Sequence, residues 1–390
     1  MVKNVVDLNF SYNMKILFSF ESGRVPLRSA TLVNWLISRG HQVDVLYDQR
    51  IAHDDMEARY YLKKANIYSS LPEVMPKFSK IPHSEIIKNI NEYDIWFADL
   101  LNYKNYSNKS QYNPYFRNFK NLLCIISLDD GNDYFNHRLD EDLHQKVGCF
   151  MNNLVFKDMT MYHPEIQKRN MLLPTYIEAS NEAYDEYVNV NKEIIRPYVE
   201  KTDFIYFSGA ITGCVPAIDC RFNSIINASR CGVSYNIRVT GTDQAPFLKY
   251  FYDYYIDPDF KKEPVDRLTF LRELNTHKII LSPKGNCQPV RRQYEGFAFN
   301  TLVFINENNV FDYLYEGTPN IHYVSYKIDC SDLKEKLRYY INNPSEAQKI
   351  ADAGTKFWED NCRVYNDGTI SKNLENTLIS NFKNITGVSL

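Results

Sequence analysis

The chain has 390 residues, of which 44% are hydrophobic and 24% charged, and its formal net charge at pH 7 is -3. This composition is typical of a globular protein and excludes fibrous and low-complexity classes. The small net charge excludes a broad basic surface, so we expect no nucleic-acid partner and no basic membrane patch. Because the length exceeds the size at which one hydrophobic core usually keeps growing, we expect two domains with a cleft between them.

The eight cysteines are scattered without C-x-x-C spacing, which argues against a zinc ribbon or a dense disulfide framework. A reducing compartment fits this pattern best. The longest apolar runs, such as Leu122 to Leu128, fall far short of the roughly 18 residues that a membrane-spanning helix needs. We therefore expect a soluble, cytoplasmic protein with no transmembrane segment.

The first elements along the chain predict a strand, a helix and a second strand. Met14 to Phe20 is a short apolar run, and apolar residues then recur at helical spacing from Leu27 to Ile37. The helix ends at Arg39 and Gly40, a basic last turn followed by a glycine cap, and Gln42 to Tyr47 follows as a strand. These segments form a βαβ unit.

Further strands at Ile95 to Leu100 and Asn121 to Leu128 extend this half into a parallel sheet covered by helices. Loops that leave the carboxyl ends of such strands border the cleft. We therefore expect the polar loops 21–24 and 129–133 to face an acceptor, with His163 nearby, although Asp-Gly-Asn turns and a histidine beside proline also serve structural roles. The acceptor-side candidates are Gly23, Arg24, Asp129 and His163, with Asp130 as a catalytic base.

A domain boundary is predicted where residues 177–201 become polar and acidic without a strand-like run. A second series of alternating strands and helices then begins at Asp203, and residues 344–358 and 371–382 have a helical pattern. The predicted strands of this half are 203–209, 233–240, 278–282 and 301–305, and the predicted helices are 221–229, 268–274 and 293–299. We expect a first domain at 1–195, a second at 196–365, and a helix at 366–390 that returns to the first domain.

The segment 278–305 is the most informative part of the sequence for function. It runs from a strand through a glycine loop into a helix and a further strand. A loop between a parallel strand and a helix N-terminus binds phosphate, because free N–H groups and the helix dipole favour an anion. Lys284, Arg291 and Arg292 add positive charge, and we expect Arg292 to be exposed at the helix start. Glu295 lies on the same helix flank, where a surface salt bridge with the arginines is the simpler alternative.

This segment resembles the signature of group-one GT-B glycosyltransferases, including their CgeB-like and exostosin-like relatives. The likeness covers about residues 200–360 and departs from the family at Cys287, where retaining members usually carry a glutamate. Asn300 replaces a glycine before the next strand, which is compatible with a left-handed backbone. The matching residues are Ser282-Pro-Lys-Gly285, Arg292-Gln-Tyr-Glu295, Gly296 to Phe304, Ser208-Gly209, Arg221, Gly241 and Ala351 to Trp358.

The resemblance implies an α/β protein of the GT-B fold, with two Rossmann-like domains. It implies a hexosyltransferase-like enzyme that moves sugar from a UDP- or GDP-sugar to a hydroxyl of a glycan or glycoprotein, with retention of configuration. Glu295 would bind the donor ribose, and the basic side chains would neutralise the leaving diphosphate. No cofactor is required, and a divalent metal is possible but not implied. The donor-binding candidates are Gly209, Arg221, Lys284, Gly285 and Glu295, with Arg291 and Arg292 in catalysis.

Two other functions fit the same sequence. A sugar-nucleotide epimerase would convert the donor without an acceptor, and a non-catalytic sugar-nucleotide-binding protein would keep only the donor fold. The Asp257-Pro-Asp259 stretch resembles the D-x-D metal motif of another glycosyltransferase class, but it is isolated and more typical of a turn. No metal site is expected.

Overall fold

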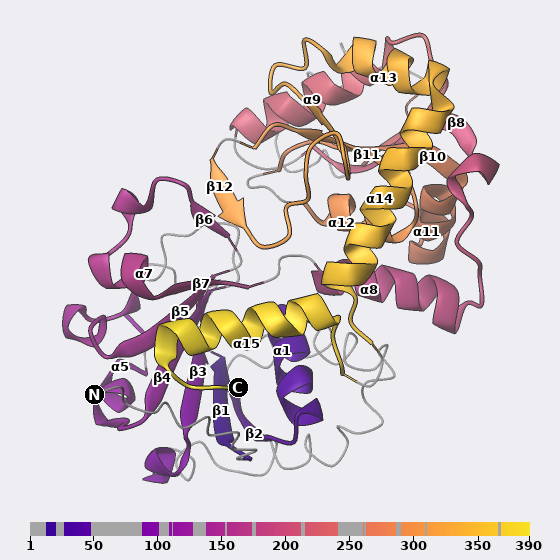
Figure 1. The fold of residues 1–390 in the computed structure, drawn as a ribbon. Helices are drawn as coiled ribbons and strands as arrows, with labels where there is room; N and C mark the ends of the chain where they lie inside the picture. The colour runs from indigo at the N-terminus through magenta and orange to yellow at the C-terminus, as the bar shows by residue number, and fades with distance from the viewer. Residues whose placement is uncertain are drawn as a thin grey trace, which may run out of the picture.

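The computed structural model describes residues 13–20, 27–47, 88–100, 109–110, 112–127, 138–152, 154–173, 177–211, 215–240, 260, 263–285, 290–308, 310–365 and 368–390. It shows two lobes, each built on its own sheet, with helices between them (Figure 1). Several predicted positions lie outside the described residues, namely Gly23, Arg24, Asp129, Asp130, Gly241, Asp257, Asp259 and Cys287.

The first lobe contains a six-stranded parallel sheet in the order β2-β1-β3-β4-β5-β7. Its central strand β3 is buried along its whole length, as expected when helices cover both faces of a parallel sheet. Trp96 on this strand packs edge to face against Phe116 and Phe119. The strands are β1 (Lys15–Phe20), β2 (Gln42–Tyr47), β3 (Ile95–Asp99), β4 (Leu122–Ser127), β5 (Val147–Asn152) and β7 (Asn170–Leu172).

Helices and short helical turns connect these strands. Helix α1 begins at Leu27, after the first strand, as the helical spacing predicts. The α-helices of this lobe are α1 (Leu27–Ser38), α5 (Asn113–Asn118) and α7 (Pro164–Arg169). The 3-10 turns are η3 (Ile90–Glu92), η4 (Glu141–Leu143) and η5 (Met159–Met161).

The second lobe contains a five-stranded parallel sheet in the order β13-β11-β10-β8-β9. Two parallel sheets of this kind make the chain an α/β protein with two Rossmann-like lobes. The strands are β8 (Thr202–Ala210), β9 (Tyr235–Thr240), β10 (His277–Ser282), β11 (Leu302–Asn306) and β13 (Val324–Tyr326). The helices are α9 (Val215–Ser229), α11 (Arg267–Thr276), α12 (Arg291–Ala298) and α13 (Leu333–Asn342).

Helices from both halves of the chain join the lobes. Helix α8 (Ile177–Tyr184) contacts α1 in the first lobe and α12 in the second. The π-helix η6 (Asp185–Val190) follows it directly, and the turn η7 (Tyr198–Glu200) comes later in the chain. The long helix α14 (Pro344–Cys362) descends from the second sheet. In the part of the chain that the structure describes, no helix is long and apolar enough to cross a membrane.

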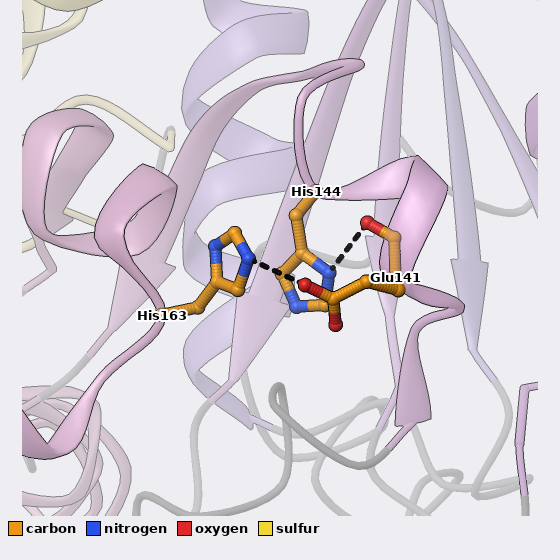
Figure 2. Close-up of side chains that lie close together, drawn as sticks. All are labelled: Glu141, His144 and His163. Atoms are coloured by element: carbon orange, nitrogen blue, oxygen red, sulfur yellow. Dashed lines mark hydrogen bonds and ion pairs between the residues drawn. The ribbon is translucent and has the colours of Figure 1, made fainter.

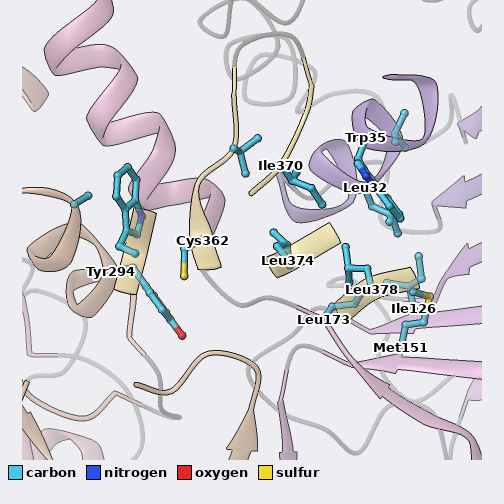
Figure 3. Packing of buried hydrophobic residues seen from close by; sticks show 14 of the residues in the cluster. Leu32, Trp35, Ile126, Met151, Leu173, Tyr294, Cys362, Ile370, Leu374 and Leu378 are labelled. Atoms are coloured by element: carbon cyan, nitrogen blue, oxygen red, sulfur yellow. The ribbon is translucent and has the colours of Figure 1, made fainter. Parts of the chain in front are cut away.

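Helix α15 (Lys372–Thr386) returns to the first lobe, as the sequence predicts, and packs against β5 and β7. Phe382 lies against Phe97, with ring centroids 6.1 Å apart, and Trp35 Nε1 donates a hydrogen bond to Glu375 Oε1 at 3.3 Å. One hydrophobic cluster consequently runs from Leu32 and Ile126 in the first lobe through Leu374 and Cys362 to Tyr294 in the second (Figure 3).

A two-stranded antiparallel ribbon forms a further link between the lobes. Strand β6 (Leu154–Phe156) belongs to the first half of the chain and pairs with β12 (Phe311–Tyr313) from the second half. Next to it, Lys157 N–H donates to the Val310 carbonyl at 2.9 Å. This ribbon was not predicted, because strands of three residues carry too little pattern to be recognised.

Candidate functional site

The predicted donor residues gather at the carboxyl ends of β8 and β10, next to the start of α12. This edge follows from the fold, because the loops that leave parallel strands open on one side of the sheet. Ser208 and Gly209 lie just before the last residue of β8, Lys284 and Gly285 follow β10, and Arg292 lies in the first turn of α12.

Arg292 is partly buried, which corrects the prediction of an exposed residue at the helix start. Its Nη2 donates to the Ser208 carbonyl at 2.6 Å, and its guanidinium carbon lies 4.6 Å from the centre of the Phe207 ring. The Nε atom is buried and has no hydrogen-bond partner among the described residues. Burial and the nearby Arg221 lower the pKa of Arg292 to about 10, so the cation is held in an environment that disfavours positive charge.

The second arginine, Arg221 on α9, fixes the turn after β10. Its Nε donates to the Lys284 carbonyl at 3.2 Å and its Nη1 to the Ala210 carbonyl at 3.1 Å. A Cβ atom at Gly285 would lie 2.7 Å from Arg221 Nη2, and a Cβ at Gly209 would collide with Arg292 Nη2. Both glycines are therefore required to let guanidinium groups approach the backbone.

A buried polar network holds the backbone of the turn after β10 in place, and the sequence did not indicate it. Asn306, at the end of β11, accepts hydrogen bonds from the Lys284 N–H at 2.9 Å and the Tyr326 hydroxyl at 3.1 Å. That hydroxyl also lies 2.9 Å from Ser224 Oγ on α9. The contacts join residues up to 102 positions apart, so no local pattern could have indicated them.

The i,i+4 salt bridge between Arg291 and Glu295 is present at 2.7 Å, but Glu295 is buried, with 3% of its side chain exposed, so the pair does not lie on the surface as the simpler alternative supposed. Its Oε1 accepts from Arg291 Nε at 2.7 Å and from Arg267 Nη1 at 3.3 Å. Burial opposes ionisation, but the two arginines outweigh it and hold the pKa of Glu295 below its ordinary value. Arg267 is the partner that the sequence did not indicate, since it lies 28 residues earlier on α11.

Together these residues place several cationic side chains at the carboxyl ends of β8 and β10, where backbone carbonyl oxygens bind two of them. Arg221 and Arg292 bind backbone oxygens, and Arg291 is paired with Glu295. The Lys284 ammonium has no ion-pair partner within the described ranges. Such an arrangement suits a ligand with several negative oxygens, because arginine forks and free backbone N–H groups can both donate to it.

His163, expected on the acceptor side, lies in the first lobe and belongs to a different cluster (Figure 2). Its Nε2 is 3.0 Å from Glu141 Oε1, its Nδ1 accepts from the Glu165 N–H at the start of α7, and its ring stacks on His144. The structure thus brings Lys284, Gly285, Arg291, Arg292, Glu295, Gly209 and Arg221 together and leaves His163 apart from them.

Comparisons with known proteins agree with this architecture. Residues 230–366 match the family model described as glycosyl transferase family 90. The structure is similar to that of an alpha-glucosyltransferase in complex with UDP, with 12% identity and a TM-score of 0.51 over 88% of this chain and 95% of the other. It is also similar to HepE from Anabaena in complex with UDP, with 11% identity and a TM-score of 0.52 over 88% of this chain and 94% of the other. No curated protein matches the sequence.

The fold is therefore that of the GT-B glycosyltransferases, as the sequence predicts. The family match covers the strands, helices and loops that include Arg267, Lys284 and Glu295. It adds the reaction class to the fold, and the chain is a glycosyltransferase.

Proposed function

We propose that this glycosyltransferase transfers a hexosyl group from a UDP-sugar to a hydroxyl group of a glycan or glycoprotein. The observation that carries the proposal is the placement of Arg292 and Arg221 at the carboxyl ends of neighbouring strands, each held by carbonyl oxygens. The structural relatives solved with UDP support UDP, rather than GDP, as the nucleotide.

The diphosphate would bind between the turn at Lys284 and the start of α12. In the reaction the bond from the anomeric carbon to the phosphate oxygen breaks, and negative charge develops on the departing diphosphate. Arg292, Lys284 and the N–H groups at the start of α12 would stabilise this charge, as preorganised donors do at other leaving groups. Arg291 would contribute through its pairing with Glu295.

Glu295 would bind the ribose of the donor. Its Oε1 is occupied by arginines, and the structure records no hydrogen bond to Oε2 from the described residues. A ribose hydroxyl would donate to Oε2, while Arg267 and Arg291 keep the carboxylate ionised and oriented. The donor would therefore occupy the second domain, 196–365, and the acceptor the first domain, 1–195.

We further propose that transfer retains the anomeric configuration and requires no metal cofactor. In a retaining route the leaving phosphate assists the incoming hydroxyl, which gives its proton to a phosphate oxygen. In an inverting route an acceptor-side base, with Asp130 as the candidate, removes that proton. Proton NMR of the first-formed product distinguishes the two, and inversion together with activity loss in Asp130→Asn would contradict retention.

The decisive experiment incubates the protein with UDP-hexoses, GDP-hexoses and a panel of glycan acceptors, with and without added Mg²⁺. We expect UDP release coupled to a new glycoside, with equal rates in both metal conditions. Interconversion of sugar nucleotides without an acceptor would indicate an epimerase. Binding of UDP-sugars with neither product nor slow hydrolysis would indicate a non-catalytic binding protein.

A further inference from the structure

A second polar cluster lies in the first lobe and comprises Glu141, His144 and His163 (Figure 2). Each residue offers one carboxylate oxygen or imidazole nitrogen, and these atoms all lie within 4.8 Å of one another. Glu141 begins the turn η4, His144 follows that turn, and His163 precedes α7. Two separate chain segments therefore converge on one point.

His144 provides the observation that calls for a ligand. The residue is 1% exposed, and its Nε2 atom is buried with no hydrogen-bond partner among the described residues. Its Nδ1 lies 3.4 Å from the Glu141 carbonyl oxygen, which it can approach as an N–H donor. In that tautomer Nε2 carries a lone pair, and leaving a buried acceptor unsatisfied costs about 1–3 kcal/mol. Metal-binding histidines commonly donate their other N–H to a backbone carbonyl in this way.

His163 and Glu141 already lie close to the spacing of ligands on one metal ion. The distance from His163 Nε2 to Glu141 Oε1 is 3.0 Å. Tetrahedral zinc with bonds of about 2.0–2.2 Å places its ligand atoms only slightly farther apart. Metal binding at Nε2 requires the tautomer that carries the ring proton on Nδ1, so the proton moves from Nε2 to Nδ1 and the bond that Nδ1 accepts from the Glu165 N–H is given up.

The two imidazole rings must also open from their stack. Their centroids lie 4.1 Å apart with an angle of 24° between the planes, whereas a metal ion must lie near the plane of both rings. The Glu141 side chain is 84% exposed and that of His163 is 22% exposed, so both can move without disturbing the core. His144, which is fixed by burial, would define the position of the ion.

Among the three neighbouring carboxylates, Glu141 is the one that Arg117 does not bind and that can bind a metal ion. The neighbouring Asp140 and Asp142 are both bound by Arg117, at 2.5 Å and 2.9 Å. Imidazole nitrogens combined with a single carboxylate suit zinc better than magnesium or calcium, which prefer sites made of oxygen ligands alone.

We propose that Glu141, His144 and His163 bind one Zn²⁺ ion, with water in the fourth position. The site lies beside the amino end of β5, since His144 precedes Val147, whereas the cleft of such a fold borders the carboxyl ends of the strands. The ion would therefore tie the turn η4 to α7 and stabilise the first lobe, without taking part in sugar transfer.

The test is isothermal titration of the full chain with Zn²⁺ after dialysis against a chelator, together with thermal unfolding. We expect one Zn²⁺ per folded chain and a higher unfolding temperature when it is bound. Glu141→Gln and His163→Gln should each weaken binding by roughly tenfold or more, since even supporting residues of metal sites contribute 10- to 100-fold. Glu165→Gln is the matched control, because it removes a nearby carboxylate that pairs with Lys168 and Arg169 instead.

Co²⁺ substitution provides a second measurement, because its visible absorption reports coordination by nitrogen and oxygen. Circular dichroism shows whether each variant is folded, and Glu141→Gln is the safest variant since that side chain is exposed. The absence of binding to the folded parent would overturn the proposal. Binding that Glu141→Gln and His163→Gln weaken no more than Glu165→Gln would overturn it equally.

Discussion

The strand ends of the second sheet and the η4–α7 corner of the first lobe have opposite chemistry. At the first, Arg292 and Arg221 donate to neutral carbonyl oxygens, an arrangement that suits an anion. At the second, Arg117 neutralises two aspartates, and a buried imidazole nitrogen is left available to a cation. The comparison teaches that the unsatisfied group, rather than the number of charges, indicates what each region can bind.

The largest expected effect comes from Arg292→Met, which keeps an apolar side chain over Phe207 but removes the cation. Loss of charged hydrogen bonds to the diphosphate should weaken UDP binding by about 1.5–3 kcal/mol, or roughly 10- to 150-fold. Because the lowered pKa shows that the fold disfavours this charge, the unfolding temperature without ligand should not fall.

Calorimetric titration with UDP and scanning calorimetry measure both effects. Arg291→Met is the control, because it removes a neighbouring arginine from the same helix turn. Arg291 is already paired with Glu295, so its loss should weaken UDP binding less. Zn²⁺ binding should be the same in Arg292→Met as in the parent. UDP affinity equal to that of the parent in Arg292→Met would remove the proposed diphosphate site.

Glu295→Gln should raise the KM for the donor, because an amide accepts ribose hydroxyls less strongly than a carboxylate. The expected loss of binding free energy is about 1.5–3 kcal/mol. It should also alter the pH dependence of stability. The folded pKa of Glu295 lies below the unfolded value near 4.5, so its contribution is complete above that value and is lost as the pH falls through the folded pKa. Urea unfolding between pH 3 and pH 7 should thus show a weaker acid dependence in the variant. A full preference for ribose over 2'-deoxyribose in the variant would contradict the assigned role.

Gly209→Ala should weaken UDP binding by a smaller amount, because it displaces the Arg292 side chain. The added methyl group would collide with Arg292 Nη2, so the guanidinium must move away from the Ser208 carbonyl. We expect roughly tenfold weaker UDP binding, equivalent to about 1.4 kcal/mol. In the double variant with Arg292→Met the glycine substitution should add little, since its target is gone. Fully additive effects would show that Gly209 acts independently.

The smallest effect on UDP binding is expected for Lys201→Met, which tests a buried cation outside both regions. Lys201 is 4% exposed and donates to the Phe299 carbonyl and to Thr301 Oγ1. Burial, with a contribution from Arg196, lowers its pKa to about 7. The unfolded chain therefore binds more protons between about pH 7 and pH 10, and this residue makes stability rise with pH there by at most about 1.4 kcal/mol per pH unit.

Urea unfolding of the parent and of Lys201→Met at pH 7 and pH 9 measures this contribution as the difference between the two proteins. UDP affinity should not differ between them at either pH. An identical pH dependence in both proteins would mean that Lys201 keeps its ordinary pKa.

Much of the fold could be predicted because its signals are local. The strand at 278–282, the helix at 293–299 and the strand at 301–305 were recognised from apolar period and glycine position, and the structure has them within two residues. Asn300 has a φ of 52°, in the left-handed region that its substitution for glycine suggested. By contrast β5 was missed, because Val147 to Asn152 mixes a glycine, a cysteine and an asparagine into a short buried strand.

The candidate site was predictable only as far as its residues are neighbours in the chain. Arg292 and Glu295 share a helix turn, so their spacing was informative. The burial of Glu295, the role of Arg267 and the support from Asn306 and Tyr326 arise when distant strands and helices pack together. The same is true of His144 and His163, which are 19 positions apart and meet only through the packing of α7.

The position of α15 has a consequence for how the protein is made. The strands that it covers end at Leu172, whereas α15 starts at Lys372, so the ribosome completes the second sheet before it supplies this cover. Until then the apolar surface around β5 and β7, which Leu374, Leu378 and Phe382 will bury, faces water on the nascent chain. The lobe synthesised first thus receives its full apolar cover only when one of the last helices is made, and a chain stalled between the two is the species most in need of chaperones.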